Sequence, residues 1–510
     1  MLSRLTAGLA VAALLAAAPL PAQQLPVQEH TLSNGLRVLL VERPGQATIG
    51  TAWAAHAGAA NERPGATGLA HLLEHMIFKG TKAIGTRDAK RDAELNAAQD
   101  KVYAEIEKEY DLLRARQLRG EIPDMFDPKV RSERHQKLLA ELEGLTKEQQ
   151  ELLVKGEFDT LYTEIGSPGT NAFTSNDVTC YILTVPANRL EFWCWMESDR
   201  LNTPVFREFY AERDVVNDER RLGEATPTGR FEEAFEAMVW QAHPYHWPVV
   251  GWGSDIALAT RANLTDFFRR NYAPDNVTLA LVGGFKASDV LPMLERYFGR
   301  IPARPGSAGR LVTLEPKQVA PQRMVAEAET TPAATVAWKT VALAHRDQAA
   351  LDVLAHVLRG RSGRLTRALV LEQKISNQAN ATHNASKYGG TFTLNATAAQ
   401  TGTPEAAEQA LLAEVARVQK AGVTELELTK AKNQLLAGRL RQMDGNMELA
   451  IALATTDANA GNGYRALLEA PEGIRAVTRE DVQRVAARYL VPEGSNTLIY
   501  HRPAAAKESR

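Results

Sequence analysis

The sequence predicts an α+β protein made of two homologous α/β sandwich domains, the first of which carries an inserted long helical hairpin. Three observations support this prediction. The chain has 510 residues, its two halves contain similar segments, and one charged stretch interrupts the first half. Because a single hydrophobic core stops growing beyond about 250–300 residues, a chain of this length is expected to divide into at least two domains.

Two pairs of similar segments indicate the duplication. The segment ATIGTAW ends at Trp53, and the similar AATVAW ends at Trp338. A segment around Tyr272 resembles a later one around Tyr489. The interval between the two tryptophans exceeds that between the two tyrosines by nearly the length of the charged stretch at 87–161. We interpret this as a duplicated α/β domain with an insertion in the first copy.

Local patterns in the first half are typical of particular elements. Residues 30–60 alternate in the manner of strands, and residues 68–78 have a helical pattern. The stretch 87–161 is rich in Glu, Lys, Arg, Gln, Ala and Leu and is interrupted at residues 120–123 by Gly-Glu-Ile-Pro. This predicts two long helices joined by a turn, which we interpret as a solvated helical hairpin.

The expected organisation has four parts: a signal peptide at 1–22, an N-terminal domain at 23–300, a Pro- and Gly-rich linker at 301–322 and a homologous C-terminal domain at 323–510. In the first part, Arg4 precedes an apolar run that is short for a membrane span, and small residues lead to a cleavage site after Ala22. A periplasmic or secreted mature chain is therefore expected, with an uncleaved membrane anchor as the alternative.

Charge and cysteine content narrow the functional classes. The 59 Lys and Arg residues nearly balance the 61 Asp and Glu residues, which gives no sign of a nucleic-acid partner. No later stretch is long and apolar enough to span a membrane. Cys180 and Cys194 are the two cysteines, and both have the surroundings of small buried hydrophobic residues. The sequence leaves open whether they form a disulfide.

His71, Glu74 and His75 form the pattern H-x-x-E-H. On a helix these three side chains share one face. Two imidazoles one turn apart can bind one Zn²⁺ through nitrogen, and three protein ligands leave a fourth position open. Zinc lowers the pKa of a bound water toward about 7, and the Glu74 carboxylate is placed to accept the proton. The pattern therefore predicts a hydrolytic zinc site with Glu74 as the catalytic base.

The motif and its flanks, GLAHLLEHMIFKGT, resemble the pitrilysin/insulinase family of inverted-motif zinc metallopeptidases, and in particular its two-domain members similar to the mitochondrial processing peptidase. In that family a helix with the pattern E-R-x-x-V-x-x-E supplies the third ligand, and here ERDVVNDE runs from Glu212 to Glu219. The resemblance implies one zinc per chain, with Glu219 as the third ligand and Glu212 orienting a ligand histidine. The alternative is that both glutamates only decorate a surface helix. The separation of His75 and Glu219 along the chain is longer than usual in the family, which agrees with an insertion.

The segment TNAFTSNDVTCY at residues 170–181 matches the family's strand beside the zinc, which holds substrate as an added β-strand. This match implies that Asn171 and Ala172 contact the peptide backbone of the substrate. A purely structural role in the strand and turn is the alternative for both residues.

The second half lacks two hydrogen-bonding residues that self-sufficient family members carry. In those members an arginine and a tyrosine seven residues apart bind the substrate and the tetrahedral intermediate. Here Leu371 stands in place of the arginine and Asn377 or Gln378 in place of the tyrosine. Since leucine cannot donate a hydrogen bond, we expect a heterodimer with a zinc-less homologous sister. The alternative is a homodimer or monomer that uses Arg364 or Arg367 instead.

The sequence thus predicts an exported zinc metalloendopeptidase that hydrolyses peptides or unfolded polypeptide segments by zinc-activated water, as the catalytic subunit of a heterodimer. The alternative is a catalytically silent binding or assembly subunit of the same fold, against which the intact Glu74 argues. Substrate preference and the role of the hairpin do not follow from the sequence.

Overall fold

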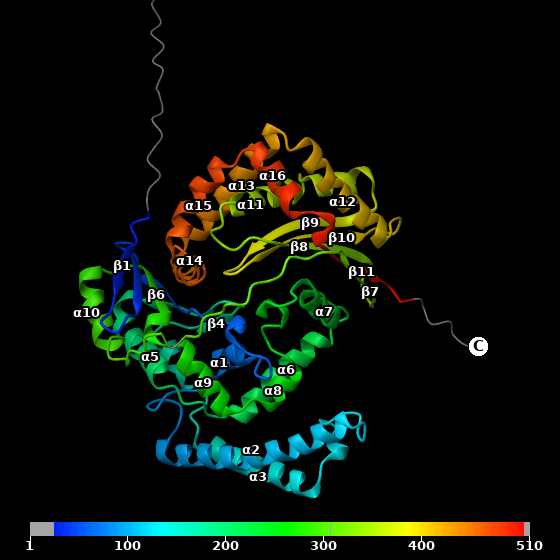
Figure 1. The fold of residues 1–510 in the computed structure, drawn as a ribbon. Helices are drawn as coiled ribbons and strands as arrows, with labels where there is room; N and C mark the ends of the chain where they lie inside the picture. The colour runs from blue at the N-terminus through cyan, green and yellow to red at the C-terminus, as the bar shows by residue number, and fades with distance from the viewer. Residues whose placement is uncertain (1–24, 307, 504–510) are drawn as a thin grey trace, which may run out of the picture.

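The computed structural model describes residues 25–306 and 308–503, which form two halves, each built on one mixed β-sheet (Figure 1). The expected signal peptide lies outside these residues. The first sheet consists of β1 (Gln28–Thr31), β2 (Arg37–Glu42), β3 (Thr48–Ala55), β4 (Asn171–Thr174), β5 (Thr179–Pro186) and β6 (Val277–Gly283). The second sheet consists of β7 (Gln322–Glu327), β8 (Ala333–Thr340), β9 (Ser376–Ala385), β10 (Gly390–Ala398) and β11 (Ser495–His501).

Apart from the additional β1, the two sheets share one topology, which confirms the predicted duplication. The first has the order β1-β2-β6-β3-β5-β4 and the second the order β7-β11-β8-β10-β9. Each contains one parallel pair, β2 with β6 and β7 with β11, and its other pairs are antiparallel. Trp53 in β3 and Trp338 in β8 occupy corresponding strands, and both side chains are buried.

Most helices of the first half cover one side of its sheet, and two of them form the hairpin. The helices of this half are α1 (Leu69–Met76), α2 (Ala89–Leu118), α3 (Glu133–Leu152), α4 (Glu157–Glu164), α5 (Leu190–Asn202), α6 (Phe209–Glu224), α7 (Gly229–Val239), α8 (Gly253–Leu258), α9 (Arg261–Asn271) and α10 (Ala287–Tyr297). The long helices α2 and α3 form the predicted hairpin, which projects at the bottom of Figure 1.

The ends of the hairpin helices follow from their sequence. The Asp88 side chain accepts hydrogen bonds from the first free N–H groups of α2, and Ser132 does the same for α3. Just beyond the end of α2, Gly120 has a φ of 74°, a left-handed conformation that glycine adopts without strain. The segment up to residue 161 also contains the start of α4, whose Phe158 and Tyr162 are buried in the same core as Tyr103 and Ile106 of α2.

The second half repeats this arrangement without a hairpin. Its helices are α11 (Gln348–Leu358), a π-helical segment (Thr366–Glu372), α12 (Pro404–Ala421), α13 (Glu425–Asp444), α14 (Asn446–Asn459), α15 (Arg465–Ala476) and α16 (Arg479–Tyr489). In the described chain, α11 leads directly to the π-helical segment, whereas the corresponding connection after α1 contains α2 and α3.

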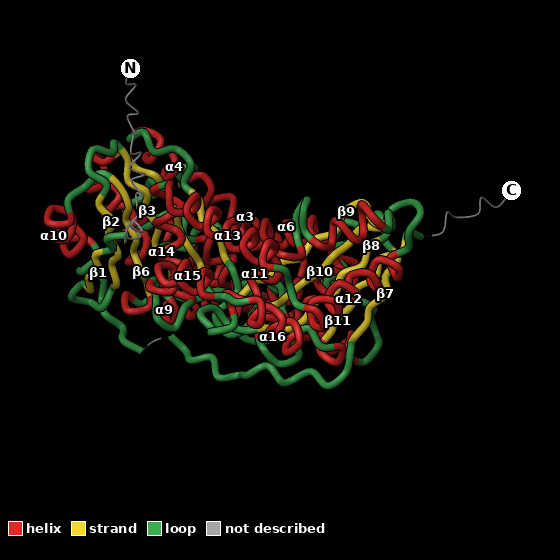
Figure 2. Tube along the Cα trace, turned by 90° about the horizontal axis from the view of Figure 1, so that it is seen from above, coloured by secondary structure: helices red, strands yellow, loops and turns green. Residues whose placement is uncertain are grey.

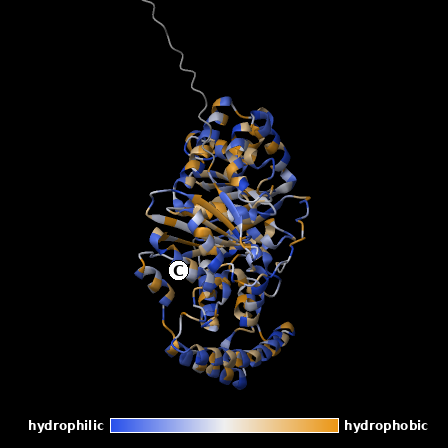
Figure 3. Ribbon diagram, turned by 90° about the vertical axis from the view of Figure 1, so that its left-hand side faces the viewer, coloured by the Kyte–Doolittle hydropathy of each residue, from blue (hydrophilic) through white to orange (hydrophobic). Residues whose placement is uncertain are grey.

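Each half covers part of the sheet of the other half. Leu449 and Leu453 of α14, in the second half, pack on Ala52 and Val282 of the first sheet. Conversely, Phe235 and the neighbouring residues of α7 pack on the second sheet around Tyr500. Figure 3 shows apolar residues concentrated in the strands between the helical layers. The two cores are therefore joined by an exchange of helices, and burial of this apolar surface stabilises the pair of domains as one body.

The segment between α10 and β7 joins the two halves. Apart from residue 307, which is not described, residues 302–321 contain no helix or strand, and Figure 2 shows this segment as a long loop along one side of the molecule. Cys180 and Cys194 are buried and free. None of the helices within residues 25–306 and 308–503 combines the length and apolar character that crossing a membrane requires.

Candidate metal centre

Helix α1 presents His71, Glu74 and His75 on one face while its leucines pack into the core. Its N-terminus is fixed by Glu62, whose carboxylate accepts hydrogen bonds from the backbone N–H groups of Gly68 at 2.8 Å and Ala70 at 2.7 Å. Burial raises the pKa of Glu62 well above its ordinary value, although these backbone hydrogen bonds act in the opposite direction. The helix is therefore anchored at its start, one turn before His71.

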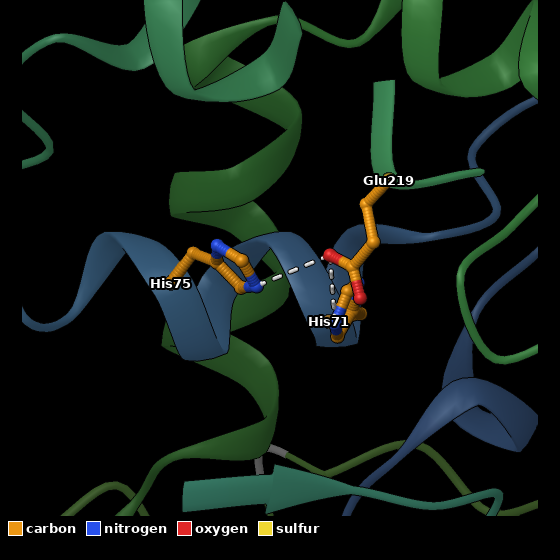
Figure 4. A group of neighbouring side chains, drawn as sticks. All are labelled: His71, His75 and Glu219. Carbon is orange, nitrogen blue, oxygen red and sulfur yellow. Dashed lines mark ion pairs between the residues drawn. The ribbon is translucent and has the colours of Figure 1, made fainter. Parts of the chain in front are cut away.

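Helix α6 brings Glu219 to the two imidazoles. Its Oε2 lies 3.8 Å from His71 Nε2 and 3.7 Å from His75 Nε2 (Figure 4). One potential ligand atom from each of the three residues lies within 4.8 Å of the other two. Among the described residues, this is the one group of three or more His, Cys, Asp or Glu side chains close enough to hold a metal ion.

Glu212 lies two turns before Glu219 on the same helix and contacts His75 from the other side. Its Oε1 is 3.0 Å from His75 Nδ1, and its Oε2 is 2.5 Å from Lys79 Nζ. Burial raises the pKa of Glu212, but the hydrogen bonds from His75 and Lys79 outweigh it and lower this pKa to about 2. Glu212 is thus a carboxylate at neutral pH. The buried Nδ1 of His71, in contrast, has no hydrogen-bond partner in the described part of the chain.

Glu74 faces the edge strand β4. Its Oε2 accepts a hydrogen bond from Thr174 Oγ1 at 2.5 Å. Burial raises the pKa of Glu74 above its ordinary value, although the bond from Thr174 acts in the opposite direction. A carboxyl group with a raised pKa is better suited to accept and return a proton than one at its ordinary value.

A pocket of about 570 Å³ opens beside Glu74 and His75. Asn171 and Ala172 of β4 form one part of its lining, and residues 153–159, which follow α3, form another. The hairpin therefore ends at the wall of this pocket. A cavity of this size next to an acid–base group is where a substrate side chain would be expected.

The free edge of β4 is available to another strand. β4 pairs with β5 on one side and ends the sheet on the other. Because Ser175 N donates to Val178 O in the connecting turn, the alternation of an antiparallel pair directs the backbone groups of Ala172 outward. The N–H of Ala172 donates to its neighbour Asn171 Oδ1 at 2.9 Å. A peptide strand added at this edge would accept a hydrogen bond from the Ala172 N–H in place of Asn171 Oδ1.

The second half places the residues at the expected arginine and tyrosine positions on its surface. The Leu371 side chain is exposed, as are Asn377 and Gln378 at the start of β9. Arg364, an alternative donor, instead forms two hydrogen bonds of 2.7 Å with Glu427 of α13. Arg364 is therefore held in a structural ion pair.

Sequence reasoning missed two contacts of this centre. Thr174 holds Glu74, and Lys79 neutralises part of the Glu212 charge. Both residues lie in segments that match the family's motifs, so the sequence places them near the centre. It does not give the direction in which their side chains point. The predicted Asn171 and Ala172 line the pocket, and the predicted Glu212 contacts His75.

The fold and this centre define a two-domain protein whose described residues include one cluster of potential metal ligands, in the first domain. Comparisons with known proteins agree with this fold. A family model described as insulinase (peptidase family M16) matches residues 37–141, and one described as peptidase M16 inactive domain matches residues 259–435. The chain belongs to the insulinase (M16) family of peptidases.

Relatives and solved structures extend the similarity over most of the chain. Zinc protease PqqE of Helicobacter pylori is 24% identical over 92% of this chain and 91% of its own length. The probable mitochondrial-processing peptidase subunit beta of Arabidopsis thaliana is 23% identical over 90% of this chain and 75% of its own. Such relatives support a peptidase as the class of activity.

Two solved structures show the same fold. A protease from Helicobacter pylori gives a TM-score of 0.74 at 23% identity and covers 93% of this chain and 99% of its own. The periplasmic protease PqqL from Escherichia coli gives 0.69 at 17% identity and covers 95% of this chain but 48% of its own. This chain thus corresponds to about half of that protease.

Proposed function

We propose that this protein is an exported zinc-dependent peptidase that hydrolyses peptides or unfolded polypeptide segments. The observation that carries this proposal is the meeting of His71, His75 and Glu219, whose potential ligand atoms lie within 4.8 Å of one another. Two imidazoles and one carboxylate are a ligand set of catalytic zinc sites, which keep one position open.

The residues present fit the ion. Ligands at about 2.0–2.2 Å from one tetrahedral zinc lie roughly 3.4 Å apart. The distances of 3.7 and 3.8 Å between Glu219 Oε2 and the two imidazole nitrogens are close to this value. When bound, zinc polarises a carbonyl group and lowers the pKa of water.

Glu74 is the proposed base and later acid. It accepts a proton from the attacking water and returns it to the leaving amine, which the raised pKa of its carboxyl group favours. Thr174 orients the carboxylate through the 2.5 Å hydrogen bond from its hydroxyl. Because Thr174 lies in β4, the strand that would receive substrate also positions the base.

The substrate is proposed to add to the free edge of β4 as an extended strand. Backbone hydrogen bonds at Ala172 would hold it without regard to sequence, Asn171 beside it would contact the peptide backbone through its side-chain amide, and the adjoining pocket would receive a side chain. Such binding selects for segments without stable structure, because a folded chain has already paired its backbone groups.

We further propose that the chain works with a zinc-less homologous sister. In support, Leu371 cannot supply the hydrogen bonds of the missing arginine, and a relative is named as subunit beta of a processing peptidase. Export is supported by the apolar N-terminal segment of the sequence and by the periplasmic protease PqqL among proteins of the same fold. A periplasmic or secreted location is therefore proposed.

The test combines zinc analysis with a peptide-library digest of the purified chain, alone and mixed with candidate sisters. We expect one zinc per chain and cleavage that rises strongly when the sister is added. Full activity of the lone chain would reject the heterodimer. Zinc binding without cleavage under any condition would favour a silent assembly subunit, and absence of zinc would reject the proposed enzyme.

A further inference from the structure

Arg207 is a buried cation one residue before the N-cap of α6, the helix that carries Glu212 and Glu219. Its side chain is 1% exposed and that of its counterion Asp92 is 2% exposed. Buried arginines are rare unless their donors are satisfied, and this one directs its planar fork at two segments and itself lies at the start of a third. It therefore marks a junction between those segments.

The first segment is the loop that follows α1. Arg207 donates to the carbonyl oxygens of Thr81 at 2.6 Å and Ile84 at 2.9 Å, and more weakly to that of Lys79 at 3.4 Å. Gly80 permits this approach, because a Cβ atom there would lie 2.7 Å from Arg207 Nη1. The course of this loop is thus matched to the guanidinium group.

The second segment is the root of the hairpin. Arg207 Nε donates to Asp92 Oδ2 at 2.7 Å, and the other oxygen of Asp92 accepts from Gln149 Nε2 at 2.7 Å. Asp92 lies in the first turn of α2 and Gln149 in the last turn of α3, so α2 contacts Arg207 directly and α3 is linked to it through Asp92. The oxygen of the Gln149 amide accepts from the backbone N–H of Glu208, at 3.4 Å.

The third segment is the start of α6, next to Arg207 in the chain. Two further contacts connect Arg207 to the metal centre through Lys79 and Glu212. The carbonyl of Lys79 is bound by Arg207, and the ammonium of Lys79 pairs with Glu212 at 2.5 Å. Glu212 in turn holds His75 Nδ1 at 3.0 Å. Displacement of the loop would move Lys79, and displacement of α6 would move Glu212.

We propose that Arg207 is a positioning residue through which the root of the inserted hairpin sets the metal centre. By binding the hairpin, the loop after α1 and the start of α6 together, it fixes Glu212 and Glu219 relative to His71 and His75. The hairpin is thus a structural part of the centre. This inference rests on the proposed zinc site, and it adds a residue that does not touch the zinc, the substrate or the ligands.

The test measures zinc affinity by chelator competition, the visible spectrum of the cobalt-substituted protein, and kcat and KM on a peptide that the wild-type protein cleaves. Arg207→Met is expected to raise the zinc dissociation constant at least about tenfold, the lower end for residues that support metal ligands. It should also alter the cobalt spectrum and lower kcat more than it raises KM. Asp92→Asn should have the same effects to a smaller degree, and Arg207→Lys should recover part of the loss.

Two controls separate positioning from general loss of stability. Leu294→Ala opens a cavity in the core of the same domain, and Arg91→Met removes an exposed ion pair across the hairpin root. Neither should change zinc affinity or the cobalt spectrum. The inference is overturned if folded Arg207→Met binds zinc within about twofold of wild type, or if Leu294→Ala, at an equal fall in melting temperature, weakens zinc as much.

Other outcomes remain decisive. If Arg207→Met does not fold, Arg207→Lys and Asp92→Asn decide by the same criteria: weakened zinc binding in both supports the inference, and wild-type binding in either overturns it. If the wild-type protein binds no zinc, the proposed function fails and this inference fails with it. If the wild-type protein binds zinc and the variants bind it equally well, only this inference fails.

Discussion

His75 Nδ1 lies 3.0 Å from Glu212 Oε1, on the side of the imidazole that faces away from Glu219. A carboxylate accepts a hydrogen bond, so Nδ1 carries a proton, and Nε2, which faces Glu219, is the nitrogen left to bind a metal ion. The bond to Glu212 thus fixes which nitrogen of the ring could serve as a ligand.

Removal of the Glu212 charge should weaken zinc binding without abolishing it. Glu212→Gln keeps the size of the side chain but no longer offers His75 and Lys79 a full negative charge, so the zinc dissociation constant is expected to rise about 10–100-fold. Chelator competition measures this change. Asp218→Asn, an exposed substitution on the same helix, should leave zinc affinity at the wild-type value. An unchanged zinc affinity in Glu212→Gln would show that the Glu212 charge does not support zinc binding.

Glu74→Gln should separate metal binding from catalysis. The amide cannot take a proton from water, so kcat is expected to fall at least about 100-fold while the zinc content remains that of the wild-type protein. Peptide turnover and metal analysis of the same sample give both quantities. Continued turnover near the wild-type rate would eliminate Glu74 as the base.

The ion pair between Arg364 and Glu427 should make stability depend on acid pH. Hydrogen bonds from Arg364 lower the pKa of Glu427 from 4.5 to about 2, so folding stabilises the ionised carboxylate. This contribution is complete above about pH 4.5 and is lost as the pH falls toward about 2. Urea unfolding should therefore show that Glu427→Gln loses less stability than the wild-type protein over this interval.

Two comparisons complete that measurement. The neighbouring exposed Glu425→Gln should follow the wild-type pH dependence. Equal slopes for Glu427→Gln and the wild-type protein would contradict the assignment of Arg364 to a structural pair and return it to the candidates for substrate binding.

The packing of α14 on the first sheet should contribute strongly to stability. Leu453 is buried there, and Leu453→Ala is expected to lower the free energy of unfolding by about 2–5 kcal/mol through loss of contacts and formation of a cavity. Urea or thermal unfolding measures it. Leu440→Ala, on the exposed side of the preceding helix, should change stability by no more than about 0.5 kcal/mol. A small effect at Leu453 would argue that α14 rests loosely on the sheet.

The sequence allowed the fold class and the candidate ligands to be predicted because their patterns are local or repeated. The H-x-x-E-H spacing places His71, Glu74 and His75 on one helical face by periodicity alone, and the equivalent tryptophans Trp53 and Trp338 mark equivalent strands. The pairing of distant carboxylates with these residues came from resemblance to a family rather than from spacing.

Other features depend on which segments meet in space, and no local pattern encodes that. Glu62 anchors α1 from just upstream of the helix, and Thr174 reaches Glu74 from a distant part of the chain. Arg207 and Asp92 are ordinary charged residues in the sequence, and their burial follows only from how the hairpin docks. The sequence pattern predicts that the charged residues of the hairpin are exposed to solvent. This is correct for most of the hairpin but not for its root, where Asp92 is buried.

The packing of α7 and α14 on the sheet of the opposite half affects how the chain can fold during synthesis. The apolar face of the first sheet is complete once β6 has been synthesised up to Gly283, yet its cover, α14, begins only at Asn446. During synthesis the nascent first half therefore presents bare aliphatic surface, a state that favours association with other chains. A chain cut between the halves would leave both pieces in that condition, so the polypeptide must arrive nearly whole before either half can finish folding.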